Sequence, residues 1–372
     1  MSSGAIERAA DAEVIEGVIV PAAADGVTAY DPEMVAALRV LHALEDDAND
    51  HLEDIRPRKT RTGYARDWVV WQDFHDHLAE ETGMRLPDGA VTKGTLVKFV
   101  RWLDERLEAA PATIGRRITG ITVEARVRGI EVSADATKAA RAVLKTITLD
   151  REKVKRARGK ATAATPAHLR IMATAGTVVP KAEGSRRRRA VYELPELARL
   201  RDRALAAVAF GIGGRSAEVS LLDVDGIRQT AEGLEVHVPS VKRRPARDVV
   251  VAYGESADSC PVRCWLAWKE AAGITSGPAF LPVDQWGHLG TGRLSPDSCR
   301  KVITRAAERA GVGVRLTGHS MRSGLVTTSR KAGKRVEKIM EQTGHSPKSA
   351  EFWGYIRDAE KWDDAATDGI GL

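Results

Sequence analysis

Apolar residues between positions 57 and 155 recur at helical spacing, and polar turns separate the repeats. One set falls close to a single helical face: Tyr64, Trp68, Trp71 and Leu78. A second stripe contains Leu96, Val97, Val100, Leu103 and Leu107, with turns indicated around Pro87 and at Ala109-Ala110-Pro111. Aromatic residues at this spacing are most often core residues. The pattern therefore predicts an all-helical domain over this part of the chain.

The C-terminal half, residues 166–372, predicts helices together with one small antiparallel sheet. Leu197 to Phe210 has the pattern of a buried helix, and two further helices are expected over Pro261 to Ala271 and Ser295 to Ala310. The strand signals are the alternating segment from Leu234 to Val238 and the β-branched segment from Asp248 to Tyr253. The fold class predicted for the whole chain is mainly α.

The N-terminal segment differs from the rest in charge. Residues 1–56 carry 13 acidic and 3 basic side chains, a net charge of −10; the whole chain carries +6, so the other 316 residues carry +16. We expect residues 1–30 to be disordered and a helix to begin at Asp31, with Pro32 in its first turn. A basic body indicates a polyanionic partner, most commonly nucleic acid, although charge that only maintains solubility is the alternative.

Cysteine and hydropathy patterns exclude several classes of protein. Cys260, Cys264 and Cys299 are odd in number and follow no signal peptide, which favours a reducing cytoplasm over a disulfide-bonded secreted protein. The pair Cys260 and Cys264 has no second ligand pair at the spacing of a structural zinc site, so no metal is expected. No stretch approaches the ~20 apolar residues of a membrane span.

Two basic segments are candidates for DNA contact. In Ala112 to Arg128, isoleucines form an apolar stripe while arginines, Arg116 and Arg117 among them, project elsewhere, as they would on a helix that enters a major groove. Arg151 to Ala164 is rich in lysine, arginine and alanine and predicts an extended linker along the phosphates, with Arg156 and Arg158 as contacts. A solvated basic face is the alternative for the helix. The run Arg186 to Arg189 is a solvated loop or a further DNA contact.

Five polar residues of the C-terminal half form a set that can break a phosphodiester without a metal: Arg215, His319, Arg322, His345 and Tyr355. Arginine offers a permanently charged planar fork for phosphate oxygens, histidine moves protons near neutral pH, and a tyrosine hydroxyl can attack phosphorus. His319 and Arg322 are spaced to lie one helical turn apart on the same face, so both could address one phosphate. Glu218, three residues after Arg215, is placed to orient that guanidinium.

The order Arg, His-x-x-Arg, His, Tyr resembles the tyrosine recombinase (phage integrase) family. The string Gly318-His319-Ser320-Met321-Arg322-Ser323-Gly324 carries the strongest likeness, and Thr343-Gly344-His345-Ser346 resembles the second histidine motif of the family. The segment Tyr355-Ile356-Arg357-Asp358 is similar to the sequence around the nucleophile of Cre-like members. The resemblance covers residues 57–372 and is strongest over 315–358.

This resemblance implies a two-domain, C-shaped DNA clamp. Residues 31–155 would form the helical core-binding domain, 156–165 a basic linker and 166–372 the catalytic domain, ending in a tail, 359–372, that exchanges between subunits. Tyr355 would attack the scissile phosphate, Arg215 and Arg322 would stabilise the transition state, His319 would act on the nucleophile's proton and His345 would bind the phosphate. Lys242 on the predicted hairpin matches the general acid of the family best. Its neighbours Arg243 and Arg244 make the exact assignment ambiguous, and a loop that only binds phosphate is the alternative.

The implied activity is site-specific recombination of double-stranded DNA at an inverted-repeat site. It would proceed through a 3′-phosphotyrosyl intermediate and a Holliday junction, within a tetramer on DNA and without cofactor or metal. One departure is that Tyr355 follows His345 by ten positions, one more than is typical of the family. Alternatives that the sequence leaves open are a type IB topoisomerase-like or telomere-resolving strand transferase and a catalytically silent DNA-binding protein. The DNA site and the biological task cannot be read from the sequence.

Overall fold

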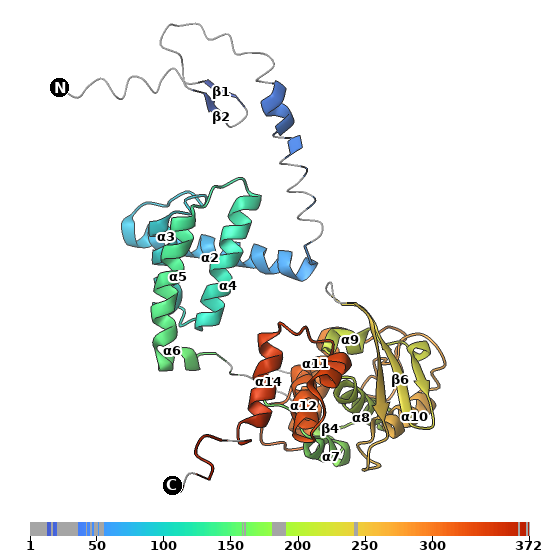
Figure 1. Cartoon of the computed structure of the whole chain (residues 1–372). Coiled ribbons are helices and arrows are strands. Elements are labelled where there is room, and N and C mark those ends of the chain that lie inside the picture. The colour runs from blue at the N-terminus through green and yellow to red at the C-terminus, as the bar shows by residue number, and fades with distance from the viewer. Residues whose placement is uncertain are drawn as a thin grey trace, which may run out of the picture. The chain divides into compact units, whose positions relative to one another are not determined.

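The computed structural model divides the chain into two compact units, residues 1–158 and 159–372, which we describe separately (Figure 1). The described residues are 13–15, 18–20, 36–41, 43–44, 47, 51, 56–157, 159, 161–180, 191–241, 245–363, 365–369 and 371. No helix among them is long and apolar enough to cross a lipid bilayer.

The first unit begins with a short strand pair that the sequence did not lead us to expect. β1 (Glu13–Ile15) pairs antiparallel with β2 (Val18–Val20), inside the segment predicted to be disordered. Valine and isoleucine dominate both strands, and these β-branched residues favour extended backbone. Residues 36–41 are helical, whereas the predicted start of that helix at Asp31 lies outside the described residues.

The predicted all-helical region is confirmed. It consists of α2 (Arg58–Thr82), α3 (Lys93–Glu105), α4 (Pro111–Val127), α5 (Ala134–Leu149) and the short α6 (Arg151–Lys155). Of the aromatics predicted for the core, Trp68 and Trp71 are buried and Tyr64 is half-buried, and Phe74 and Phe99 are fully enclosed beside them. Trp71 and Phe99 pack edge to face at 5.1 Å between ring centroids, a favourable arrangement for aromatic pairs.

The segment after α5 differs from the predicted extended linker. Residues 151–155 form α6, and the Asp150 side chain accepts hydrogen bonds from the backbone amides of Glu152 and Lys153 at its start. Lys153 Nζ and Arg156 Nη1 both bind the buried carboxylate of Asp104, at 2.6 and 2.7 Å. The prediction of an extended chain from position 151 was therefore wrong, because a cap and two ion pairs with α3 stabilise a helical turn there.

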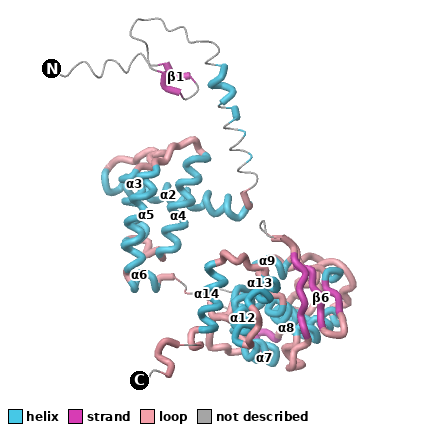
Figure 2. Tube along the Cα trace, in the orientation of Figure 1, coloured by secondary structure: helices cyan, strands magenta, loops and turns pink. Residues whose placement is uncertain are grey.

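The second unit is mainly helical and contains a three-stranded antiparallel sheet (Figure 2). Its first part comprises α7 (Pro166–Thr174), β3 (Val178–Pro180), β4 (Val191–Glu193), α8 (Glu196–Gly211), α9 (Ser216–Ser220) and the 3₁₀ turn η2 (Val224–Gly226). The sheet has the order β5 (Ile227–Gln229), β6 (Gly233–Val238) and β7 (Arg247–Ala252). α10 (Pro261–Ala271), α11 (Pro296–Arg309), α12 (Gly318–Lys331), α13 (Val336–Thr343) and α14 (Ala350–Glu360) follow.

These elements confirm the fold class, with both predicted strands present as β6 and β7. The strand pairs β5–β6 and β3–β4 were not predicted, because β3, β4 and β5 are only three residues long and show no alternation. The main core contains Trp265, Trp268 and Phe280, and within it α8 packs on α10.

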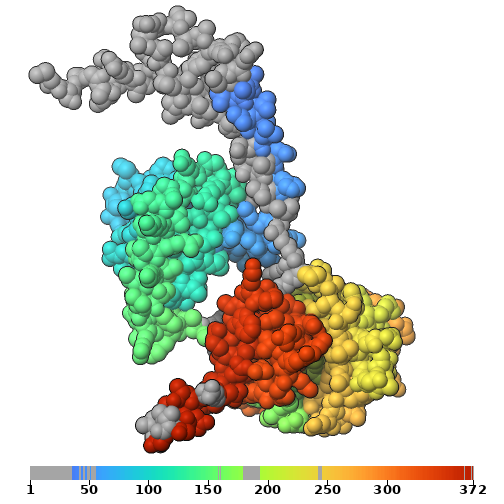
Figure 3. All heavy atoms as spheres, viewed as in Figure 1, coloured from blue at the N-terminus to red at the C-terminus, as the bar shows by residue number. Residues whose placement is uncertain are grey.

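A smaller core joins α12, α13 and α14, and it includes Tyr355. Val326, Ile339, Phe352, Tyr355 and Ile356 are all buried in this cluster. The surface formed by the C-terminal helices is the orange to red region of the second unit in Figure 3. Packing on α12 therefore fixes the helix that carries the tyrosine beside the helix that carries His319 and Arg322.

Two glycines permit the close approaches that this arrangement needs. A Cβ on Gly213, whose φ is 57°, would lie 2.6 Å from Thr343 Cγ2. A Cβ on Gly324 would lie 2.2 Å from the carbonyl oxygen of Ala164, whose amide donates to Ser320 O at 2.9 Å. Only glycine allows the turn before Arg215 and the chain at Ala164 to pack this tightly against α12 and α13.

Candidate active site

Four separate parts of the second unit carry the five predicted polar residues. Arg215 immediately precedes α9, His319 and Arg322 lie one turn apart on α12, His345 follows α13, and Tyr355 lies in α14. The sequence separations are large, up to 140 positions between Arg215 and Tyr355. The ring centroids of His345 and Tyr355 are 6.4 Å apart, and the charges of Arg322 and Arg215 act on the Tyr355 hydroxyl, so these residues share one site.

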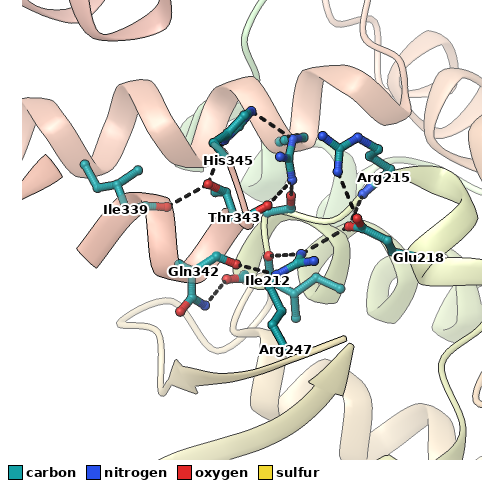
Figure 4. Close-up of polar contacts among 11 residues, drawn as sticks. Ile212, Arg215, Glu218, Arg247, Ile339, Gln342, Thr343 and His345 are labelled. Carbon is teal, nitrogen blue, oxygen red and sulfur yellow. Dashed lines mark hydrogen bonds and ion pairs between the residues drawn. The ribbon is translucent and has the colours of Figure 1, made fainter. Parts of the chain in front are cut away.

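Glu218 orients Arg215, as predicted from their spacing, but it also binds a residue that the sequence did not indicate. Its Oε1 accepts a hydrogen bond from Arg215 Nη1 at 2.9 Å, and its Oε2 accepts from the Arg215 backbone amide at 2.9 Å. Arg247, the first residue of β7, donates from Nη2 to the same Oε2 at 3.1 Å. Figure 4 shows the Glu218 carboxylate between the two arginines. The buried Glu218 carboxylate, which Arg247 also binds, therefore holds Arg215 in place.

The electrostatic balance at Glu218 favours the ionised carboxylate. Burial alone would raise the pKa of Glu218, but the hydrogen bonds and positive charges of Arg247 and Arg215 outweigh it and lower the pKa below its ordinary value. The side chain is only 3% exposed. Removing this charge would leave two arginines without their buried partner.

We predict that Glu218→Gln destabilises the second unit by about 3 kcal/mol, the usual cost of removing one partner from a buried ion pair. Hydrogen exchange of the β6 and β7 amides reports unfolding of this unit specifically. Glu235→Gln, which removes an exposed pair with Arg228, is the matched control and should cost less than about 0.5 kcal/mol. Equal protection of the two variants would show that the Glu218 pair contributes nothing to stability.

The same variant should change the response to acid. The pKa of Glu218 in the folded state lies below its unfolded value of about 4.3. Its stabilising effect is therefore fully present above that pH and is lost as the pH falls through the folded value. Glu218→Gln should accordingly lose less stability on acidification than the wild type.

Arg322 is fully buried and is fixed by carbonyl groups and His345. Its Nη1 donates to Gly213 O at 2.7 Å and to the carbonyl of Thr343, and its Nε donates to His345 Nε2 at 3.2 Å. His345 Nδ1 lies 2.7 Å from Thr343 Oγ1, which itself donates to Ile339 O at 2.7 Å (Figure 4). Because the threonine proton is directed to Ile339, His345 donates from Nδ1 and accepts at Nε2, which is the neutral tautomer.

This network gives His345 a positioning role that the sequence did not indicate. Thr343 fixes the ring, and the ring accepts from Arg322, so His345 orients a guanidinium in the observed arrangement. The phosphate contact expected from the family resemblance requires Nε2 to carry a proton instead. That contact stays a prediction.

The Tyr355 hydroxyl, His319 Nε2 and one Glu351 carboxylate oxygen form a triangle of close contacts. The hydroxyl is 2.6 Å from His319 Nε2 and donates to Glu351 Oε1 at 2.9 Å, while the same Glu351 oxygen lies 2.8 Å from His319 Nε2. Glu351, one helical turn before Tyr355, was not singled out from the sequence. His319 is therefore in direct contact with the hydroxyl on which it was predicted to act.

Tyr355 is protonated in this environment. Burial is the largest cause that raises the pKa of its phenol above the ordinary value, and the hydrogen bond and negative charge of Glu351 raise the pKa further. Arg322 and Arg215 act in the opposite direction and lower the pKa. The side chain is 2% exposed. The two arginines supply the field that a phenolate needs, and Glu351 opposes it.

The residues predicted as the general acid and its neighbours, Lys242, Arg243 and Arg244, lie outside the described residues. Their loop joins β6 to β7, and Arg247 at the start of β7 contacts Glu218. The five positions from Lys242 to Arg247 can span at most about 17 Å of extended chain. The general-acid role of Lys242 stays a prediction.

Two of the four arginines predicted to contact DNA in the first unit, Arg116 and Arg156, pair with carboxylates of the protein. Arg116 forms a bidentate pair with the buried Asp67, with its Nη2 at 2.7 Å from Oδ1, and Arg156 binds Asp104. Arg117 Nε and Nη1 are buried without a hydrogen-bond partner among the described residues, and burial lowers the pKa of this group. Arg158 lies outside the described residues. Contact with DNA stays a prediction for all four, and Arg116 and Arg156 would have to share or release a carboxylate.

Among the described residues, no three side chains of histidine, cysteine, aspartate or glutamate are arranged to hold a metal ion. The three cysteines are free and buried. Burial raises the pKa of Cys264, and it raises the pKa of Cys299 to about 12.

No protein-family model matches the chain. Among curated proteins, it is 24% identical over 302 residues to an integrase/recombinase XerD homologue of Selenomonas ruminantium, covering 80% of this chain and 81% of the relative. It is 31% identical over 147 residues to tyrosine recombinase XerD of Corynebacterium glutamicum, covering 40% of this chain but only 45% of that relative.

The fold resembles that of solved integrases. A lambda integrase dimer bound to a core site aligns with a TM-score of 0.52 and 15% identity over 89% of this chain and 82% of the integrase chain. A lambda integrase tetramer bound to a Holliday junction aligns with a TM-score of 0.50 and 14% identity, over 87% and 79% of the two chains. In sequence the chain is therefore similar to tyrosine recombinases of the XerD type, and in fold it is similar to lambda integrase.

Proposed function

We propose that the protein is a site-specific DNA recombinase that cuts and rejoins DNA through Tyr355. The observation that carries this proposal is the 2.6 Å contact between the Tyr355 hydroxyl and His319 Nε2, within a site that also contains Arg215 and Arg322. A phenol beside a proton carrier and two fixed guanidinium groups is suited to attack on phosphorus. The finer resemblance to Cre belongs to this proposal and rests on Tyr355-Ile356-Arg357-Asp358.

In the proposed cleavage step, Tyr355 Oη attacks the scissile phosphorus while His319 accepts the phenol proton. A bond forms between Oη and phosphorus, and the bond from phosphorus to the 5′ oxygen breaks. Arg215 and Arg322 stabilise the negative charge that develops on the non-bridging oxygens. The products are a 3′-phosphotyrosyl ester and a free 5′-hydroxyl. The ester conserves the energy of the phosphodiester, so a second DNA end can reverse the step without a high-energy cofactor.

The departing 5′ oxygen needs a proton, and we propose that Lys242 supplies it. Lys242→Ala should cleave ordinary DNA slowly but should regain most of its rate on a 5′-bridging phosphorothiolate, because sulfur leaves without protonation. Single-turnover cleavage of the two substrates measures this difference. Rescue of Arg243→Ala or Arg244→Ala in place of Lys242→Ala would move the acid to that neighbour.

The proposed partner is double-stranded DNA with inverted half-sites, bound by four protomers during strand exchange. The +16 charge outside residues 1–56 supports a polyanionic partner. After α14, Trp362 is 76% exposed, which supports docking of the tail, residues 359–372, on a neighbouring subunit. Tail exchange from each protomer to the next is a heterologous contact that closes into a ring. DNA as substrate and the few free cysteines support a cytoplasmic protein associated with the nucleoid.

A strand transferase that only relaxes supercoiled DNA, or only resolves DNA ends, would share the same chemistry. The test must therefore measure recombination itself. DNA flanking the gene should be searched for inverted repeats around a short spacer, and two copies of each candidate should be incubated with the protein in EDTA. The proposal expects exchange of flanking sequences between copies. Relaxation or cleavage without exchange would favour the topoisomerase-like alternative, and binding without cleavage would favour a silent DNA-binding protein.

A further inference from the structure

Glu351 holds a position in the site that the proposed chemistry does not use. Its carboxylate contacts both the nucleophile, at 2.9 Å from Tyr355 Oη, and the proton carrier, at 2.8 Å from His319 Nε2. It lies four residues before Tyr355 in the first turn of α14, and its side chain is 51% exposed. An acid in a first turn also stabilises the helix, but that effect requires neither contact.

The protons of this triangle can be placed from its geometry. An ionised Glu351 is acceptor-only, so both Tyr355 Oη and His319 Nε2 must present hydrogens to it. Burial alone would raise the pKa of Glu351. The hydrogen bonds from Tyr355 and His319 and the positive charges of His319 and Arg322 outweigh burial and lower this pKa, so the carboxylate stays ionised. His319 therefore carries a proton on the nitrogen that faces the phenol. In this arrangement it cannot accept the proton of Tyr355.

We propose that Glu351 is a restraining residue for the nucleophile, whose carboxylate holds the Tyr355 hydroxyl and the His319 ring in a non-reactive arrangement until the scissile phosphate displaces it. The phosphate carries the same charge and would bind the same His319 and arginine groups, so carboxylate and phosphate exclude each other by repulsion and by competition for donors. The consequence for DNA cleavage rests on the function proposed above.

A general-base role for Glu351 is the opposite assignment, and the electrostatics oppose it. The pKa of Glu351 lies below its ordinary value, and the pKa of Tyr355 lies above its own. Transfer of the phenol proton to this carboxylate is therefore strongly uphill. A negative charge beside the hydroxyl stabilises the phenol and destabilises the phenolate that attacks phosphorus.

The test uses Glu351→Gln in the full chain, with Glu360→Gln as the matched control. Glu360 lies on the same helix but pairs with Arg330, away from the site. In a first arm without DNA, tyrosine labelled at Cζ gives five resonances, and Tyr355→Phe identifies the one from Tyr355. Its ionisation should begin at lower pH in Glu351→Gln than in the wild type or Glu360→Gln. Tyr355 also faces His319, Arg322 and Arg215, which all three proteins retain.

A second arm measures single-turnover formation of the covalent protein–DNA complex. If loss of the Glu351 charge lowers the pKa of the Tyr355 phenol by about one unit, Glu351→Gln should cleave DNA up to about tenfold faster than the wild type. An unchanged Tyr355 titration in Glu351→Gln would overturn the restraint, whether or not the protein cleaves DNA. If Tyr355 ionises at lower pH in Glu351→Gln, as predicted, but this variant cleaves as little DNA as Tyr355→Phe, the restraint is overturned in favour of a general-base role for Glu351. Failure of every variant, wild type included, to form a complex would count against the proposed function alone and leave the first arm to decide.

Discussion

Replacement of Tyr355 with phenylalanine is expected to abolish the covalent protein–DNA complex. The substitution removes only the hydroxyl that contacts His319 and Glu351, whereas the ring stays in the small core with Phe352 and Ile356. Without that oxygen no bond to phosphorus can form. The measurement is trapping on a nicked suicide substrate in EDTA, followed by denaturing electrophoresis, and the complex should fall below detection.

Binding supplies the control for this variant. Tyr355→Phe should bind the site as tightly as the wild type, because the hydroxyl is buried and the rest of the surface is unchanged. Tyr253→Phe removes a hydroxyl from a tyrosine of the same unit outside the site, and it should trap DNA normally. A covalent complex that persists in Tyr355→Phe would mean that another residue is the nucleophile.

Removal of either arginine is expected to slow cleavage by about 10² to 10³ or more, the usual effect of deleting one preorganised transition-state donor. Arg215→Ala is the cleaner test, because the Arg215 side chain is 28% exposed and its guanidinium pairs with Glu218. Arg322→Ala removes donors to two buried carbonyls and to His345, so it should lower stability as well as rate. Single-turnover cleavage and gel-shift binding separate rate from affinity.

An exposed arginine on the sheet provides the matched control. Arg228 lies on β5, and its side chain is 70% exposed, so Arg228→Ala should retain cleavage within a few-fold of the wild type. Loss of DNA binding in Arg215→Ala to the same extent as loss of cleavage would instead make this residue an anchor for the ground state.

The fold was predictable wherever one periodicity continued for several turns. Trp68, Trp71 and Leu78 recur at helical spacing and are buried on α2, and the alternation from Leu234 to Val238 became β6. The helix at 151–155 was missed, because its stability depends on Asp104, some 50 positions earlier, and no local pattern records that partner. Short strands such as β5 were missed for the same reason, since their pairing partners supply most of their stabilisation.

The candidate site was predictable in composition but not in its connections. The residues with chemistry, such as His319 and Arg322, stand in short recognisable strings. Arg247 and Glu351 do not, because an arginine after a basic loop and a glutamate at the start of a helix are both ordinary features of a surface. Their roles arise from pairing across the fold, where Arg247 meets Glu218 and Glu351 meets His319. Spacing identified the partner of Arg215, because Glu218 is only three residues away.

The most direct test of the central claim is to identify the bond between protein and DNA. The complex trapped on a suicide substrate in EDTA should be digested with protease and nuclease, and the modified peptide should be sequenced by mass spectrometry. We predict a nucleotide joined through its 3′ phosphate to Tyr355, with a free 5′-hydroxyl on the released strand. A link to any other residue, a 5′-phosphotyrosyl bond, or a complex that forms only with a divalent metal would contradict it.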